Sequence, residues 1–157
     1  MSEQTKSEGI KIVCENRKAR HNYFLEDKFE AGIMLKGTEV KSLRDGKANL
    51  QDAYAILKRG ELWLINCHIA PYTTGSHDNH EPLRTRKLLL HASELLKLYQ
   101  RMETKGYSLI PTKLYFKRGR AKLELALGKG KKNHDKRGDI KERDAKREMS
   151  RLTKSIR

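Results

Sequence analysis

The chain has 157 residues, the length of one domain, and a formal net charge of +15, which is typical of a protein that binds a polyanion. Its two cysteines, Cys14 and Cys67, are too few for a disulfide scaffold, and no apolar run has the length of a signal peptide or a membrane span. These properties argue against a secreted or membrane-embedded protein. We expect a cytoplasmic protein whose partner is a nucleic acid or an anionic surface.

Short apolar stretches predict a β-rich domain over residues 10–127, after a flexible N-terminus at residues 1–9. Alternating or apolar runs predict strands over residues 10–14, 29–35, 53–58, 61–69, 107–117 and 121–127. Arg59-Gly60 and the segment 118–120 each separate two such runs and are typical of hairpin turns. In the last strand, alternate leucines share one face and indicate a core.

Two helices are predicted between the strands. The first has Thr38 as its N-cap and ends near Gly46. The second begins at His91 or Ser93 and stops at Gly106, with an apolar stripe at residues 95, 98, 99 and 102. About six short strands with two or three flanking helices predict a mainly β fold, a small closed or partly open barrel.

The last thirty residues, 128–157, form a basic tail. They hold twelve Lys and Arg against five Asp and Glu, and they carry only a thin apolar stripe at helical spacing. That stripe cannot offset an ordering entropy of roughly 1–2 kcal/mol per residue. We therefore expect the tail to be disordered when free and helical when bound.

Two segments of the barrel have the chemistry of RNA contacts. "ENRKARHNYF", residues 15–24, combines basic residues that grip phosphates with His21, Tyr23 and Phe24, which can stack on bases, although a solvated turn with Phe24 in the core is the alternative. "PLRTRKLLLH", residues 82–91, places Arg84 and Arg86 on one face of an extended segment. A charged strand edge that deters aggregation explains this second pattern equally well.

The remaining motifs argue against metal binding and catalysis. Cys67, His68, His77 and His80 lack the paired spacing of a structural zinc site. The carboxylates are scattered, and no phosphate-binding loop or nucleophile motif is present in the sequence. We expect no cofactor, no metal and no enzymatic activity. The basic hairpin tip "LYFKRGRAK" fits a polyanion but is weak support by itself.

Several motifs in order resemble the SsrA-binding protein family, called small protein B, the partner of bacterial transfer-messenger RNA. They are "NRKARHNYF", "FEAGIMLKGTEVKSLRDGKANLQDAYA", "HIAPY", "RTRKLLLH" and "LYFKRGRAKLELALGKGKKNHDKR", and the resemblance covers residues 10–157. It implies an OB-like barrel that binds the tRNA-like part of this RNA and delivers it to ribosomes stalled without an A-site codon, which starts trans-translation. It also implies elongation factor Tu as a partner of the charged RNA, and we expect a monomer.

The resemblance also implies site residues. Asn16, Glu30, Leu89 and Lys122 match family positions tied to RNA binding, and the chemistry of their surroundings adds Arg20, His21, Arg44, Arg84, Arg86 and Lys87. An acidic residue cannot bind phosphate, so Glu30 would orient an arginine or accept from a base. Leu89 is equally compatible with the core.

The tail segment "GKGKKNHDKR" matches the part of the family that acts on the ribosome. The resemblance places Lys129, Lys131, Lys132, His134, Asp135, Lys136 and Arg137 toward the decoding centre and the empty mRNA channel, where His134 would stack on an rRNA base. The distal tail lacks a tryptophan found in some relatives. From the residue pattern alone, a ribosomal or ribosome-assembly protein fits nearly as well; a nuclease and a membrane-surface protein fit less well.

Overall fold

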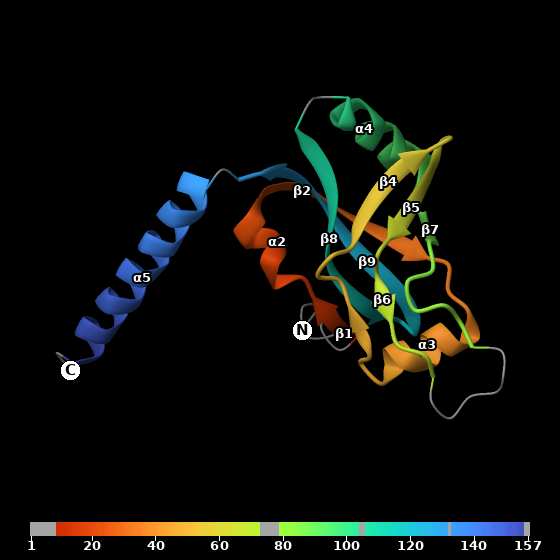
Figure 1. Ribbon diagram of the computed structural model, residues 1–157, viewed down its shortest axis with the longest axis horizontal. Helices are drawn as coiled ribbons and strands as arrows, with labels where there is room; N and C mark the ends of the chain where they lie inside the picture. The colour runs from red at the N-terminus through yellow and green to blue at the C-terminus, as the bar shows by residue number, and fades with distance from the viewer. Residues whose placement is uncertain (1–8, 73–78, 104–105, 132, 156–157) are drawn as a thin grey trace.

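The centre of the molecule is a ring of six antiparallel strands in a computed structural model that describes residues 9–72, 79–103, 106–131 and 133–155 (Figure 1). Around the ring, the order is β8 (Tyr107–Lys117), β4 (Tyr54–Lys58), β5 (Glu61–Ile65), β7 (Arg86–Leu89), β2 (Tyr23–Ile33) and β9 (Arg120–Gly130), and β9 pairs again with β8. β1 (Ile10–Glu15) pairs with β8 outside the ring, and β3 (Ala48–Asn49) pairs with β6 (His68–Ile69). The expectation of a mainly β, OB-like barrel is confirmed.

Alternating side chains fill the barrel. Leu123, Leu125 and Leu127 of β9 are fully buried, as their period of two predicts. Leu62 and Leu64 of β5 are buried in the same way, on either side of the half-buried Trp63. Because one face of each strand is committed to this core, the residues between the buried positions face outward.

The two predicted helices are present, with one boundary changed. α3 (Gly37–Arg44) has Lys36 as its N-cap, so the prediction of Thr38 is wrong; the Lys36 backbone N–H donates to Glu39 Oε1 at 2.8 Å. Gly46, with a φ of +72°, ends the segment as expected. α4 (Ala92–Met102) starts after His91 as predicted, buries Leu98 and ends four residues before Gly106.

Some elements differ from the sequence prediction. α2 (Arg17–Asn22) is a short basic helix where no apolar period signalled one. β2 begins at Tyr23 instead of Phe29, and a bulge between Glu26 and Lys28 interrupts its register with β9. The single strand predicted over residues 61–69 is broken at Asn66, whose φ of +58° turns the chain between β5 and β6.

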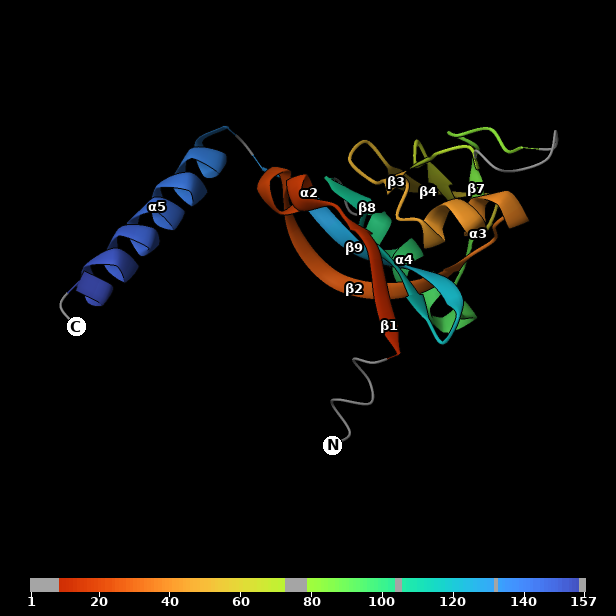
Figure 2. The ribbon, with the colours of Figure 1, turned by 90° about the horizontal axis from the view of Figure 1, so that it is seen from below.

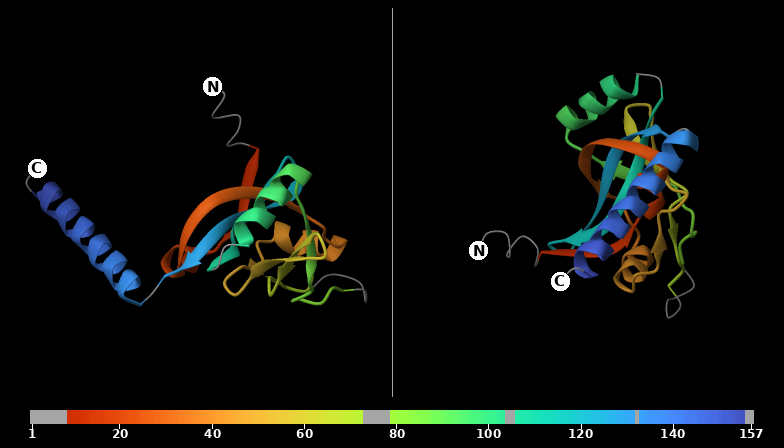
Figure 3. Two further views of the ribbon diagram at one scale, coloured as in Figure 1. Left: turned by 90° about the horizontal axis from the view of Figure 1, so that it is seen from above. Right: turned by 90° about the vertical axis from the view of Figure 1, so that its left-hand side faces the viewer.

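Most of the described part of the tail is helical. β9 continues to Gly130, beyond the predicted end at Leu127, and α5 (Asn133–Ser155) follows and projects to one side of the barrel (Figures 2 and 3). Disorder of the free tail and a domain boundary at 127/128 stay predictions. No helix among the described residues is long and apolar enough to cross a membrane.

Two Arg-Gly pairs form the tips of the long hairpins. Arg59-Gly60 joins β4 to β5 with φ values of +52° and +75°, and Arg118-Gly119 joins β8 to β9 with +52° and +76°. Positive φ at both central residues is the type I′ arrangement, which matches the twist of the strands. Glycine adopts it freely, whereas arginine does so at a cost in free energy.

Replacing Arg59 with asparagine should therefore stabilise the fold. Asparagine tolerates the left-handed conformation, and we expect Arg59→Asn to raise the free energy of unfolding by up to about 1 kcal/mol in urea titrations. Arg59→Ala is the matched control, because it removes the same charge without a left-handed preference. An equal gain from both variants would show that charge, and not backbone strain, limits stability at this tip.

Candidate nucleic-acid interface

A row of four outward-facing residues crosses the barrel wall. Leu89 of β7 pairs with Gly32 of β2, Gly32 with Lys122 of β9, and Lys122 with Tyr115 of β8. Their chain neighbours Leu88, Ala31 and Leu123 are buried in the core, so the row lies on the outside. Leu89 is 49 % exposed, which resolves the alternative left open by the sequence: it is a surface residue.

Glu30 lies two residues before Gly32 and shares its face of β2. Tyr115 Oη donates a hydrogen bond to Glu30 Oε2 at 2.5 Å, and Lys117 Nζ lies 3.4 Å from the same oxygen. The hydrogen bond from Tyr115 and then the charges of Lys117 and Lys122 lower the pKa of the Glu30 carboxyl despite its partial burial. Burial and the neighbouring Glu30 raise the pKa of the Tyr115 hydroxyl. Glu30 is thus a fixed acceptor within a cationic surface.

α2 begins at a side chain that anchors it to the barrel. Asn16 is 8 % exposed, and its amide donates to Leu50 O at 3.3 Å and to Pro111 O at 3.0 Å. These bonds use the donor that an RNA contact would need, so in this structure Asn16 positions α2. Arg20 is exposed on that helix and His21 is half-buried.

A cleft of about 560 Å³ lies beside α2, and most of its charged lining is basic. Phe24, which is 45 % exposed, stands at this cleft, so the alternative that places it in the core is wrong. Lys131 Nζ lies 5.0 Å from the Phe24 ring centre and 2.9 Å from Arg20 O, and Lys131 N donates to Asn22 O. The chain leading into the tail is therefore fastened to the barrel here.

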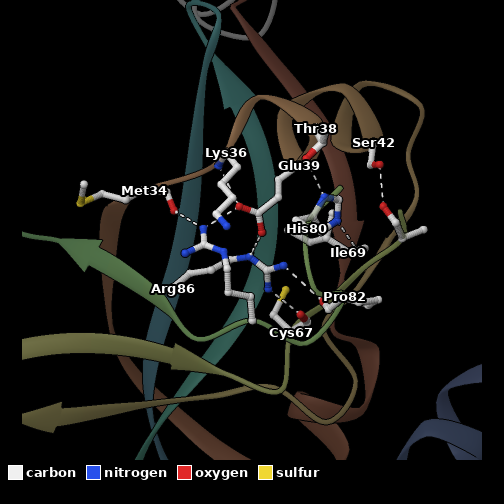
Figure 4. Close-up of polar contacts among 12 residues, drawn as sticks. Met34, Lys36, Thr38, Glu39, Ser42, Cys67, Ile69, His80, Pro82 and Arg86 are labelled. Atoms are coloured by element: carbon white, nitrogen blue, oxygen red, sulfur yellow. Dashed lines mark hydrogen bonds and ion pairs between the residues drawn. The ribbon is translucent and has the colours of Figure 1, made fainter. Parts of the chain in front are cut away.

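Arg84 and Arg86 point to the same side, but the anion that they meet is Glu39 of α3 (Figure 4). Arg86 is fully buried; its Nε donates to Glu39 Oε2, and its other nitrogens donate to Cys67 O and Pro82 O at 2.7 and 3.2 Å. A phosphate cannot reach this guanidinium, so the prediction of an RNA contact at Arg86 is wrong. Arg84 bonds Glu39 Oε1 at 2.6 Å and keeps 28 % exposure.

Glu39 remains ionised although its side chain is inaccessible to solvent. Burial acts to raise the pKa of its carboxyl, but hydrogen bonds from Arg84, the Lys36 N–H and Arg86 outweigh burial and lower the pKa. The charge is needed because Arg86 would otherwise be an unpaired buried cation. This ion cluster therefore stabilises the fold. No local sequence motif predicts it, because Glu39 lies 45 residues or more from both arginines.

The remaining predicted residues are dispersed. Lys87 is half-buried and lies 3.2 Å from Glu61, Arg44 is exposed at the end of α3, and Lys129 is exposed on β9. In α5, Arg137 is exposed and Lys136 is half-buried. His134 and Asp135 belong to the same helix, but their side chains, like all of Lys132, lie outside what the structure describes.

The histidines and cysteines do not converge in the described segments. Both ring nitrogens of buried His80 are engaged, Nδ1 with Thr38 Oγ1 and Nε2 with Ile69 O, each at 2.9 Å (Figure 4). Burial raises the pKa of the Cys67 thiol to about 12. Among the described residues, no group of three or more His, Cys, Asp or Glu is placed to hold a metal; His77 lies outside them.

Comparison with known proteins identifies the family. A family model described as "SmpB protein" matches residues 13–155. The chain belongs to the SmpB family. Similar curated proteins are the "SsrA-binding protein" of Desulfitobacterium hafniense (strain DSM 10664 / DCB-2), 58 % identical over 92 % of this chain and 93 % of that one, and that of Nostoc punctiforme (strain ATCC 29133 / PCC 73102), 57 % identical over 96 % and 97 %.

A solved structure described as "tmRNA-SmpB: a journey to the center of the bacterial ribosome" is similar in fold as well as in sequence. It shares 53 % identity with a TM-score of 0.65, over 76 % of this chain and 85 % of that chain. Within this SmpB-family chain, sequence reasoning missed Tyr115, which is buried, and Gly32, which is half-buried, as members of the row on the outer side of the barrel. Their register beside Lys122 depends on strand pairing, which no local pattern encodes.

The buried ion cluster predicts a large and pH-dependent effect of Glu39→Gln. Removing the carboxylate leaves Arg86 uncompensated, which should cost about 3–5 kcal/mol of unfolding free energy near neutral pH. Because the folded-state pKa of Glu39 is lowered, its contribution is present above the unfolded pKa and is lost as the pH falls through the folded value. Urea titrations of wild type and variant should therefore converge in acid.

Glu61→Gln is the control for this prediction. Glu61 pairs with Lys87 at the surface, with side-chain exposures of 46 % and 36 %, and its loss should change the unfolding free energy by at most about 1 kcal/mol. Similar effects of the two substitutions, or a Glu39 effect that persists unchanged in acid, would contradict the account of the buried cluster.

Proposed function

We propose that this chain binds the tRNA-like part of transfer-messenger RNA, the SsrA RNA, and delivers it to ribosomes stalled without a codon in the A site. There it enables trans-translation, in which the stalled peptide is tagged for degradation and the ribosome is released. The relatives are SsrA-binding proteins, and a similar solved chain is described with tmRNA and the bacterial ribosome. The observation that carries the proposal is that Glu30, Leu89 and Lys122 meet on one outer face.

This face has the groups that RNA recognition requires. Lys122 and Lys117 attract phosphates, and the ionised Glu30 accepts from a base amine or a ribose hydroxyl. Leu89 supplies an apolar surface next to them. Arg20, His21, Arg44, Arg84 and Lys87 extend the contact as peripheral phosphate or base ligands.

The tail acts elsewhere, on the ribosome. We place Lys129, Lys131 and Lys132, at the start of the tail, toward the ribosome, and His134, Asp135, Lys136 and Arg137 at the decoding centre, with the rest of the helix in the empty mRNA channel. The helix α5, Asn133–Ser155, and its basic composition support this placement. The protein acts as a cytoplasmic monomer, and elongation factor Tu joins it through the charged RNA.

We also propose that the protein acts by binding and not as a catalyst. The carboxylates of the outer face are held by neighbours: Glu30 by Tyr115 and Lys117, and Glu124 by Thr112 and Lys113. A nuclease needs carboxylates that are available to a magnesium ion. Metal-dependent cleavage of RNA by the pure protein, lost on a carboxylate substitution, would overturn this part of the proposal.

The RNA-binding face is tested by Lys122→Ala. Loss of a charge-assisted contact should weaken binding of a tRNA-like transfer-messenger RNA fragment about tenfold, and the slope of log affinity against log salt should fall by just under one unit. Lys97→Ala, which removes an exposed lysine of α4, is the control and should change neither quantity. Wild-type affinity and slope in Lys122→Ala would remove this face from the interface.

The tail is tested separately by changing Asp135, Lys136 and Arg137 to alanine together. We expect affinity for the RNA fragment to stay close to wild type and peptide tagging in a reconstituted translation system to be abolished, because these residues act after RNA binding. Changing Asp144, Lys146 and Arg147 to alanine removes the same charges from the same helix and should reduce tagging less. Lost RNA affinity with intact tagging would contradict the assignment.

A further inference from the structure

Gly32 lies between Leu89 and Lys122 in the row on the outer side of the barrel, and no interaction within the described chain requires a glycine there. Its φ lies outside the left-handed region, so the backbone is accessible to any residue. A Cβ at this position would meet Leu89 Cβ at 3.5 Å, an ordinary van der Waals distance. The bulge of β2 lies elsewhere, between Glu26 and Lys28. Glycine nevertheless weakens a strand interior, because it loses more conformational entropy on folding than other residues.

Gly128 of β9, by contrast, is a glycine that the packing of the chain itself requires. A Cβ there would come within 3.1 Å of Ile110 Cγ1 and 3.2 Å of Tyr23 Cβ, which is tighter than normal packing. Its glycine is thus explained by contacts with the chain's own side chains. Gly32 has no such neighbour, although it pairs with β7 on one side and β9 on the other. Close approach of a ligand is the other reason for a glycine within a strand.

We propose that Gly32 is an RNA-contact residue, whose missing side chain lets one ribose of the bound RNA lie against the backbone of β2. Leu89 and Lys122 rise from the strands on either side, with strand axes about 10 Å apart, and Gly32 adds no side chain between them. The inference rests on the proposed function. It adds to the proposed RNA contacts a residue that has no charge and no side chain.

The groups around Gly32 match the parts of a ribonucleotide. The half-exposed Leu89 packs against the carbon face of the sugar, and the Lys122 ammonium takes the adjoining phosphate. Glu30, ionised and two residues along the same face, accepts a hydrogen bond from the 2′-hydroxyl. A Cβ or a branched side chain at residue 32 would hold the sugar away from the sheet and separate it from all three groups.

Gly32→Ala and Gly32→Val test this inference in the full-length chain with a tRNA-like transfer-messenger RNA fragment. We expect both variants to melt at or above the wild-type Tm, because a side chain lowers the entropy cost of the strand. Measured below Tm, affinity should fall in order of size, with valine costing at least about tenfold. Gly128→Ala is the control: it should lower Tm and leave the affinity of the folded protein unchanged.

A double-substitution cycle separates a shared contact from a general disturbance. Leu89→Ala makes room beside residue 32, so Gly32→Val should cost less affinity in that background than in wild type. The inference would be overturned if folded Gly32→Val bound the RNA fragment with wild-type affinity, or if a lowered Tm accounted for its loss of affinity. It would also be overturned if the affinity losses of Gly32→Val and Leu89→Ala were strictly additive. If the wild-type chain itself fails to bind the fragment, the proposed function fails instead.

Discussion

The buried carboxylate of Glu39 is the constraint on which the outer face depends. It holds Arg86 inside the barrel wall, and Leu88 points inward beside it. Because side chains alternate along β7, Lys87 and Leu89 must then face outward. A shift of one residue would bury Lys87 and remove Leu89 from its place beside Gly32. A structural ion pair with no solvent exposure thus sets the register of a surface that we assign to RNA.

We assign different functions to the outer face and the tail, and one small contact joins them. Glu30, Leu89 and Lys122 gather on the barrel wall, whereas the basic helix α5 leaves from the end of β9. Between the two, Lys131 is held by the Phe24 ring and by backbone oxygens of α2. This contact fixes the position of the chain just before α5. It would therefore set the distance and orientation between RNA bound on the barrel wall and the start of the helix.

The sequence predicted the features that local patterns encode. The leucines of β9, the Arg59-Gly60 turn and the start of α4 at His91 follow from periodicity, turn chemistry and capping. It failed where a partner lies far along the chain. Two alternating arginines look the same whether they face a phosphate or Glu39, which is 45 residues from Arg84. In the same way, a run of three leucines does not show whether Leu89 faces the core or the surface. Its pairing with Gly32 of β2 places it on the outer side of the barrel.

The division of labour between barrel and tail is tested most directly by a salt series of RNA affinity. Full-length protein is compared with a chain that ends at Lys131 and so keeps β9 and the contact made by Lys131, after thermal melting has shown that both barrels are folded. The account predicts nearly equal affinities and salt slopes for a tRNA-like transfer-messenger RNA fragment, because the barrel supplies the phosphate contacts. A collapse of both quantities in the shortened chain would show that the tail is itself the RNA-binding arm, and would contradict the account.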